Sequence, residues 1–363
     1  MTRRGYTLVE LLVVIVIGAI LVGIAIPAFS ALLSSSRESL AQNSLQQSIY
    51  AARDAAASRI GGGDTAAVFF YDSSRGITIG IYEQVGTLND ASANGLNVVR
   101  DVFVPISTME PAQLPPDYSV RGFVLGTQLR DEDWYEDLTD YSPASGGIQP
   151  GGPSGSQRGP GAWVFPETDF YDKEQQDDGR DRQTFMIRFT AGTGALSRSN
   201  NSALILDPRP SNLNRNTPAA IQPIDQAEDL KAWTVRALIS AGLTSMDLQN
   251  LLGNRSSDTV LARPVSDISM YRERRLAQML QLRGLNRSTN TIYLKSDNPE
   301  VDTSLFRDST LASQRVDLET RITQWIEGRL ALDNQRDEGS ALEADSSVYT
   351  VSSYFGELVE VKR

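Results

Sequence analysis

The sequence contains no cysteine and no histidine among its 363 residues. Without cysteine, neither a disulfide framework nor a thiolate zinc site can form, so thiols say nothing about the redox compartment. Without histidine, Ser-His-Asp catalysis, Cys-His catalysis and HExxH metalloprotease chemistry are excluded. No GxSxG, Walker or dinucleotide-binding loop occurs either. These absences predict that the protein is not an enzyme and needs no cofactor.

Basic residues are scarce as well, because 34 Lys and Arg face 45 Asp and Glu, for a net charge of −11. The acidic excess lies after residue 60, since the N-terminal sixty residues hold more basic than acidic side chains. An acidic surface repels phosphate backbones, whose binding depends largely on Lys and Arg. No nucleic acid is therefore expected among the partners.

The N-terminus combines a short basic leader with a long apolar run. Arg3 and Arg4 lie in the leader, and residues 11–29 contain no charge. A run of ~20 apolar residues can cross a bilayer as a helix, and flanking basic residues keep their end in the cytoplasm. The pattern predicts a single-pass membrane protein, with a cytoplasmic N-terminus, the large C-terminal part on the other side and the lipid bilayer as a partner.

Glu10 stands at the start of the apolar run. A carboxylate near the bilayer centre costs about 2.5–3.5 kcal/mol, so an unpaired one is expected to be functional. The alternative is a flanking charge at the membrane interface. The string Arg4-Gly5-Tyr6-Thr7-Leu8-Val9-Glu10 resembles the processing motif of type IV prepilins and type II secretion pseudopilins, in which glycine precedes the cut and glutamate is the fifth mature residue.

The resemblance implies cleavage between Gly5 and Tyr6 by a prepilin peptidase, followed by N-methylation of Tyr6. It also implies that the anchor lies in a bacterial inner membrane with the head in the periplasm. The mature helix would assemble there with other pilins or pseudopilins on an inner-membrane assembly platform, into a filament that can be extruded. Tyr6 departs from the more usual phenylalanine. Pro27 falls where pilins commonly carry proline, and a mid-helix proline removes one hydrogen bond and allows a kink.

Beyond residue 31 the helical pattern becomes amphipathic. Five apolar residues recur at spacings of three and four and predict one buried face: Leu45, Ile49, Ala52, Ala56 and Ile60. Glycines 61–63 then end the helix. We therefore expect a leader at 1–5, a transmembrane and assembly helix at 6–30 and its amphipathic continuation at 31–60.

Residues 61–208 have the pattern of a β-rich head. Residues 65–71 and 77–82 alternate around a turn and predict a β-hairpin. Further strands are expected at 96–104, 120–125, 183–190 and 203–206. The predicted fold class is α+β, with a long N-terminal helix packed on an antiparallel sheet. Residues 51–56, 185–194 and 204–206 are similar to the minor pseudopilins of the H type.

Two acidic clusters, at 131–140 and 172–181, flank a Gly- and Pro-rich loop at 142–162. Asp177, Asp178 and Asp181 are the calcium candidates, but neither cluster has EF-hand spacing, so solvated loops are favoured and no metal site is predicted. Residues 209–363 are expected to form a helix-rich extension, with helices at 225–241, 245–252, 266–282 and 317–332. Residues 348–361 suggest strands that rejoin the head sheet.

Taken together, these patterns predict a structural subunit. It would be a minor pseudopilin or minor pilin of a type II secretion pseudopilus or type IV pilus. One alternative is a membrane-anchored adhesin or ligand-binding module, which the large acidic head permits. The other is an anchored enzyme, which the missing histidine and cysteine disfavour.

Overall fold

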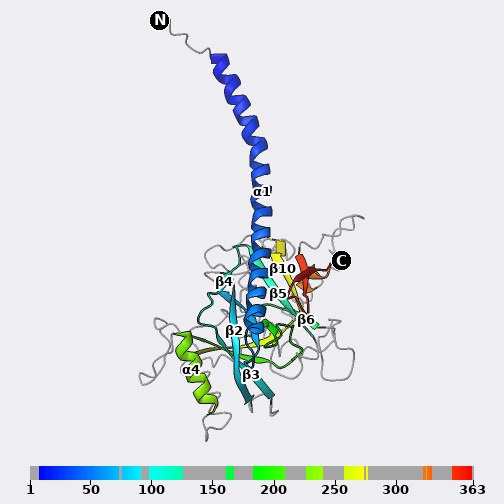
Figure 1. The fold of residues 1–363 in the computed structure, drawn as a ribbon. Helices are drawn as coiled ribbons and strands as arrows, with labels where there is room; N and C mark the ends of the chain where they lie inside the picture. Colours follow the sequence, from blue (N-terminus) through cyan, green and yellow to red (C-terminus); the bar gives the residue numbers. More distant parts are fainter. Residues whose placement is uncertain are drawn as a thin grey trace, which may run out of the picture. The chain divides into compact units, whose positions relative to one another are not determined.

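The computed structural model describes residues 8–72, 76–90, 98–125, 161–166, 183–208, 226–239, 257–273, 275–276, 322–323, 325–328 and 346–361. The chain divides into two compact units, residues 1–43 and 44–363, and each is described by itself. Helices and extensive β-sheet make the fold α+β, as predicted (Figure 1). The second unit contains both sheets.

The long N-terminal helix is α1, Leu8–Ala57. Within the second unit, Leu45, Ile49, Ala52 and Ala56 are fully buried, which confirms the predicted apolar face. The prediction for Ile60 is wrong, because α1 ends at Ala57 and Ile60 is 93% exposed. Gly61 follows with φ of 79°, a left-handed conformation that glycine adopts without strain.

The first sheet has seven strands: β1 (Thr65–Asp72), β2 (Gly76–Asp90), β3 (Val98–Pro105), β4 (Ala112–Gln113), β7 (Gln183–Phe189), β8 (Ala203–Pro208) and β9 (Ser257–Pro264). Their order is β1-β7-β9-β8-β3-β2-β4, and β1 also pairs with β2. The additional pairing closes six of these strands into a ring. The predicted hairpin is confirmed, since β1 and β2 pair from Thr65↔Glu83 to Asp72↔Gly76.

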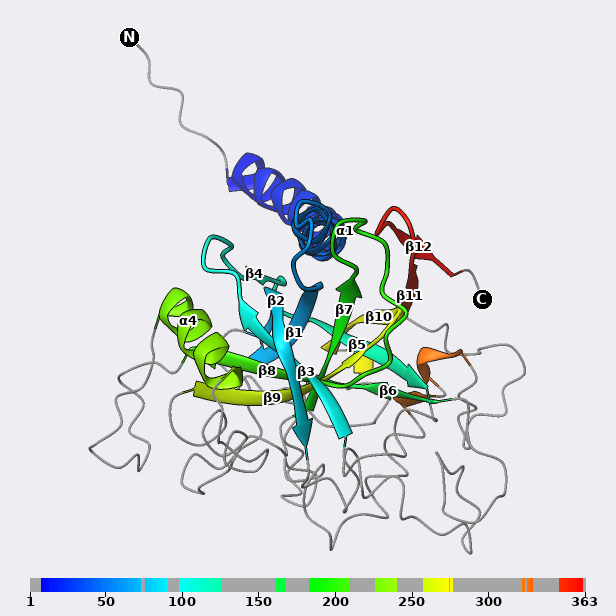
Figure 2. The same ribbon diagram turned by 60° about the horizontal axis from the view of Figure 1, so that its bottom comes forward.

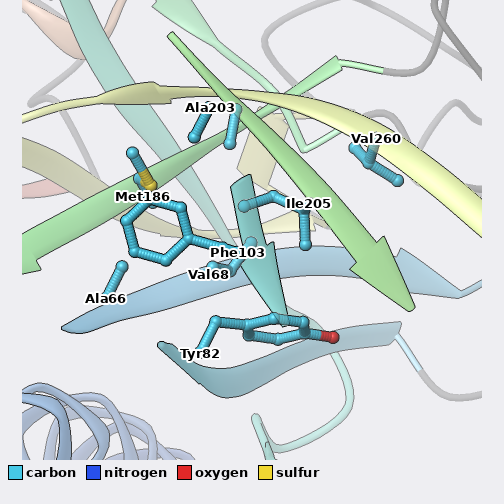
Figure 3. Packing of buried hydrophobic residues seen from close by; sticks show 9 residues of the cluster. Ala66, Val68, Tyr82, Phe103, Met186, Ala203, Ile205 and Val260 are labelled. Carbon is cyan, nitrogen blue, oxygen red and sulfur yellow. The ribbon is translucent and has the colours of Figure 1, made fainter. Parts of the chain in front are cut away.

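The inside of the ring is filled by apolar side chains from all six strands (Figure 3). The cluster comprises Ala66, Val68, Tyr82, Phe103, Met186, Ala203, Ile205, Val260 and Ala262. Every member is at most 4% exposed. Burial on this scale stabilises the ring by about 25 cal/mol for each Å² of apolar surface removed from water.

The prediction of a purely antiparallel sheet is wrong at two pairs. β3 pairs with β8 in parallel, and β7 pairs with β9 in parallel. Parallel neighbours need a long crossover connection, whereas antiparallel neighbours can be joined by a tight turn. Here the chain between the paired strands is long, and it passes through several other elements. The sheet is therefore mixed.

Helix α4 (Ala227–Leu238) covers the outer face of β2, β3, β8 and β9. It confirms the helix predicted at 225–241. Leu230 and Ala237 pack with Val102, Val104 and Leu206 in a second apolar cluster. Gly86 permits this approach, since a Cβ there would lie 2.8 Å from Leu238. The helix predicted at 245–252 lies outside the described residues.

The second sheet has five strands: β5 (Tyr118–Leu125), β6 (Gly161–Val164), β10 (Asp267–Arg272), β11 (Ser346–Val351) and β12 (Leu358–Glu360). Their order is β12-β11-β10-β5-β6. Figure 2 shows these strands to one side of the ring and α4 to the other. The sheet approaches the ring closely at Gly122, where a Cβ would lie 2.5 Å from the ring of Phe185.

The prediction of a helix at 266–282 is wrong for residues 267–272, which form the strand β10. This strand is paired on both sides, and Ile268, Ser269, Met270 and Tyr271 are all buried. A strand buried on both faces loses its polar alternation, so periodicity does not distinguish it from a buried helix.

The helix-rich extension is not confirmed. The described residues after 208 form α4, the strands β9, β10, β11 and β12, and a few short helical stretches between them. β9 lies between β7 and β8, and β10 pairs with β5. The strands predicted at 348–361 are present but belong to the second sheet. Of the helix predicted at 317–332, residues 322–323 and 325–328 are described. Residues 322–323 and 325–326 are helical, and Ile322, Trp325 and Ile326 are buried.

Candidate functional site

Two of the four predicted site residues lie within α1. Glu10 and Pro27 are both helical, so the helix continues through the proline. Gly5 and Tyr6 lie outside the described residues. No other atom of the described residues packs against α1 at Gly18 or Gly23, since a Cβ placed at either glycine would have no neighbour within 4 Å.

The described apolar side chains of the N-terminal part of α1 face solvent. Those that are exposed include Leu8, Val9, Leu12, Val13, Val14, Ile15, Val16, Ile17, Ile20, Leu21, Val22, Ile26, Phe29, Leu32 and Leu33. A soluble monomer rarely exposes a contiguous apolar surface of this kind, which marks a membrane or protein contact. Within the described part of the chain, no helix meets the length and apolarity that crossing a membrane requires. The predicted membrane-spanning half is therefore not confirmed.

The C-terminal end of α1 is tied to the ring by charge. Glu83 of β2 is 5% exposed and accepts hydrogen bonds from Arg59, just after α1, and from Lys231 of α4. The Lys231 Nζ lies 2.9 Å from both carboxylate oxygens. One buried carboxylate thus joins three elements, and removing its cationic partners would leave its charge buried and uncompensated, which is costly.

A second charged cluster lies at one end of the ring. Arg188 of β7, 5% exposed, donates to Asp64 at 2.8 Å, to Asp101 of β3 and to the Gln84 side-chain oxygen at 3.1 Å. Gln84 in turn donates to Asp101 at 3.0 Å. The guanidinium of Arg188 therefore connects its own strand β7 with β2, β3 and the residue just before β1.

This cluster is accompanied by further contacts that fix its geometry. The Arg188 guanidinium lies 5.3 Å from the centre of the Phe103 ring, in a cation–π contact. Asp64 accepts from the backbone amide of Ala191 at 3.1 Å and from the hydroxyl of Ser197. The charges of the cluster are paired and hydrogen-bonded internally, as buried charged groups of a folded core require.

Sequence reasoning missed this cluster. Its signal was a charged residue inside an otherwise apolar strand: Arg188 stands between Ile187 and Phe189, and Asp101 precedes Val102. Such residues are rarely buried unless paired. The pattern can show that partners exist, but their identity depends on the pairing of strands that are far apart in the sequence.

A buried tyrosine and carboxylate meet inside the ring. The Tyr82 hydroxyl donates to Asp207 of β8. Burial, the negative charge of Asp207 and this hydrogen bond together raise the pKa of Tyr82 well above its ordinary value of 10.0. The phenol therefore stays protonated at physiological pH and serves as a donor, not as a base.

Glu273 follows β10 and titrates near neutrality. Burial raises its pKa from 4.5 to about 7; the charge of Asp117 adds to this, and a hydrogen bond from Ser119 opposes it. Ser119 donates to the carboxylate at 2.8 Å, and the Glu273 amide donates to the carbonyl of Asp117. The carboxylate is thus held at the end of the seam between β5 and β10.

The raised pKa of Glu273 makes stability depend on pH. The folded state holds the proton more tightly than the unfolded state, so stability falls as pH rises from 4.5 through 7. We expect Glu273→Gln to be more stable than the parent at pH 8 by about 1–3 kcal/mol, and to lose this advantage towards pH 4.5. Thermal unfolding across this range measures the effect. Glu110→Gln, which removes an exposed carboxylate, is the control and should track the parent; a Glu273→Gln curve parallel to the parent contradicts the assignment.

In the described residues, no group of acidic side chains is arranged to hold a metal ion. The calcium candidates Asp177, Asp178 and Asp181, and both acidic clusters, lie outside that part of the chain. Their role stays a prediction.

Residues 1–26 match the family described as the prokaryotic N-terminal methylation motif. This motif supports the type IV pilin-like family for the chain, and it implies a membrane-anchored precursor, processing by a prepilin peptidase and assembly with other pilins. No curated protein and no solved structure matches. The similarity to H-type minor pseudopilins is not confirmed.

Proposed function

We propose that the protein is a minor subunit of a type II secretion pseudopilus or a type IV pilus, cut after Gly5 and assembled through α1. The observation that carries the proposal is the match of residues 1–26 to the methylation motif. Within this stretch Gly5 and Glu10 have the spacing that the resemblance implies, with Tyr6 in place of the more usual phenylalanine. The exposed apolar surface of α1 supports it, because such a surface needs lipid or a partner helix to cover it.

A minor rather than major role is supported by the head. A closed ring of six strands, a second sheet and the covering helix α4 form an elaborate unit for a repeating filament subunit. The described charged clusters are internally paired, which favours a structural over a catalytic role. The apolar run at residues 11–29 is proposed to anchor the precursor in the inner membrane, with the head in the periplasm.

The experiment that tests the proposal is analysis of the mature N-terminus. Intact mass and N-terminal peptides from envelope material should show a chain that starts at Tyr6 and carries one methyl group on its amino nitrogen. Gly5→Val is the matched control and should keep the leader, because the motif requires glycine before the cut. A parent chain that starts at Met1, or beyond residue 25, would remove the proposed function.

A further inference from the structure

The loop between β11 and β12 carries two exposed aromatic rings. Tyr354 is 74% exposed and Phe355 is 67% exposed, although Val351, at the end of β11, is 2% exposed. Val359 on the edge strand β12 adds to the exposed apolar surface at 52%. Aromatic side chains that face solvent on an ordered turn lose the free energy of burial, so a partner that covers them gains it.

The backbone of this loop is held against α1. Gln46 donates to the carbonyl of Gly356 at 3.0 Å and accepts from the amide of Leu358 at 2.8 Å. Arg53 donates to the carbonyl of Phe355 at 2.7 Å. Gly356 has φ of 63°, and a Cβ there would lie 3.1 Å from Arg53. The loop is therefore held in one conformation, with its aromatic side chains turned outward.

The side of α1 that holds the loop also carries an exposed tyrosine. Gln46, Tyr50 and Arg53 are spaced by four and three residues and share one helix face. Tyr50 is 36% exposed and stands between the two residues that bind the loop. Figure 2 shows β11 and β12 next to this part of the helix. We use the name hairpin surface for three exposed aromatic residues: Tyr50 on α1, and Tyr354 and Phe355 on the loop that is bonded to α1.

We infer that the hairpin surface is a second subunit contact, through which the head binds a neighbouring pilin-like subunit. The inference rests on the proposed function. The methylation motif implies assembly with other pilins, so a pilin-like chain is the partner that this protein is expected to meet. Gln46 and Arg53 bind the hairpin loop to α1, and the loop leaves its aromatic rings exposed to such a partner.

The hairpin surface has the features of a binding hot spot. Such sites are rich in tyrosine and other aromatic residues, and they bind best when the free protein already holds them in place. Gln46 and Arg53 supply that preorganisation, so they are positioning residues. The backbone amide of Leu358, on the edge strand β12, donates its hydrogen bond to Gln46. This amide cannot then pair with a strand of another protein, so a partner would contact the side chains of the hairpin surface.

The test uses the full-length chain in its own envelope, with a photocrosslinking amino acid at one of three exposed positions. Phe355 reports the hairpin surface, Leu33 reports the assembly helix, and Ile239, 77% exposed after α4, reports background. We expect crosslinks from Phe355 and Leu33 to chains that themselves carry the methylation motif, at least about tenfold above Ile239. Gln46→Ala should lower the Phe355 crosslink several-fold and leave the Leu33 crosslink unchanged.

Substitution gives a second measurement. Tyr354→Ser with Phe355→Ser should lower recovery of the neighbouring subunit by about tenfold, since each ~1.4 kcal/mol of lost contact is a factor of ten. Ile239→Ser is the matched control and should leave recovery unchanged. Equal thermal unfolding of both variants and the parent shows that the fold is intact.

The outcomes separate the inference from the proposed function. A Leu33 crosslink to pilin-like chains together with a Phe355 signal at the Ile239 level overturns the inference and leaves the proposed function in place. A Phe355 crosslink only to lipid, or to proteins without the motif, also overturns it. Loss of both crosslinks in a chain that does not start at Tyr6 removes the proposed function and the inference together.

Discussion

Replacing Arg188 with methionine is expected to destabilise the head by about 3–5 kcal/mol. The substitution removes the guanidinium that compensates the carboxylates of Asp101, which is buried, and Asp64, which is half-buried. It also removes the cation–π contact with Phe103. Because the cluster joins β1, β2, β3 and β7 at one end of the ring, the loss should appear as a lower midpoint in urea unfolding of the full chain.

The matched control is Arg198→Met, which removes an exposed arginine ten residues along the chain. Surface substitutions of this kind are usually within about 0.5 kcal/mol of the parent. A loss below about 1 kcal/mol for Arg188→Met would show that Asp64 and Asp101 find other partners, and that the cluster does not hold the ring together.

The second large effect is expected at Glu10. After cleavage, Tyr6 carries a positive amino group close to the membrane, and the amine of an incoming subunit can pair with the Glu10 of its neighbour. In a low dielectric an unpaired charge is costly, so we propose that this pairing sets the axial register of the subunits. We expect Glu10→Gln and Glu10→Val to be inserted and cleaved normally, while recovery of partner pilins falls by about tenfold or more.

Glu38→Gln is the matched control, since it removes the other carboxylate in residues 8–43 of α1. It should leave recovery close to that of the parent. Pull-down of partner pilins, at equal expression and equal processing, measures the difference. Undiminished recovery with Glu10→Val would mean that Glu10 is a flanking charge at the membrane interface, and the apolar surface of α1 would then drive assembly alone.

Several elements of the head could be predicted because their signals are local. The alternation of Ile77, Ile79 and Ile81 across from the first strand predicted the hairpin of β1 and β2, which is present. The spacing of Leu45, Ile49, Ala52 and Ala56 predicted the buried face of α1. In each case the structure is decided by residues that lie within one or two helical turns, or by residue pairs across one hairpin. A short window of sequence is therefore enough to predict the element.

Other elements could not be predicted because their partners are distant in the sequence. β9 pairs with β7 and β8 inside the ring, and β10 pairs with β5 from more than a hundred residues earlier. Full burial on both faces removed the alternation that would have marked β10 as a strand. The prediction at Ile60 failed for a related reason, since the helical spacing continued in the sequence after the helix itself had ended.

The sequence by itself determined the N-terminal motif with Gly5, Tyr6 and Glu10, the long helix, the α+β class and most strands before residue 208. These are chemical or periodic signals that neighbouring residues carry. Only the tertiary structure decided the closure of the ring, the mixed pairing, the partners of Arg188 and Glu83, and the loop held by Gln46 and Arg53. Each of these depends on which distant segments meet, and that choice is made by the free energy of burying the whole core.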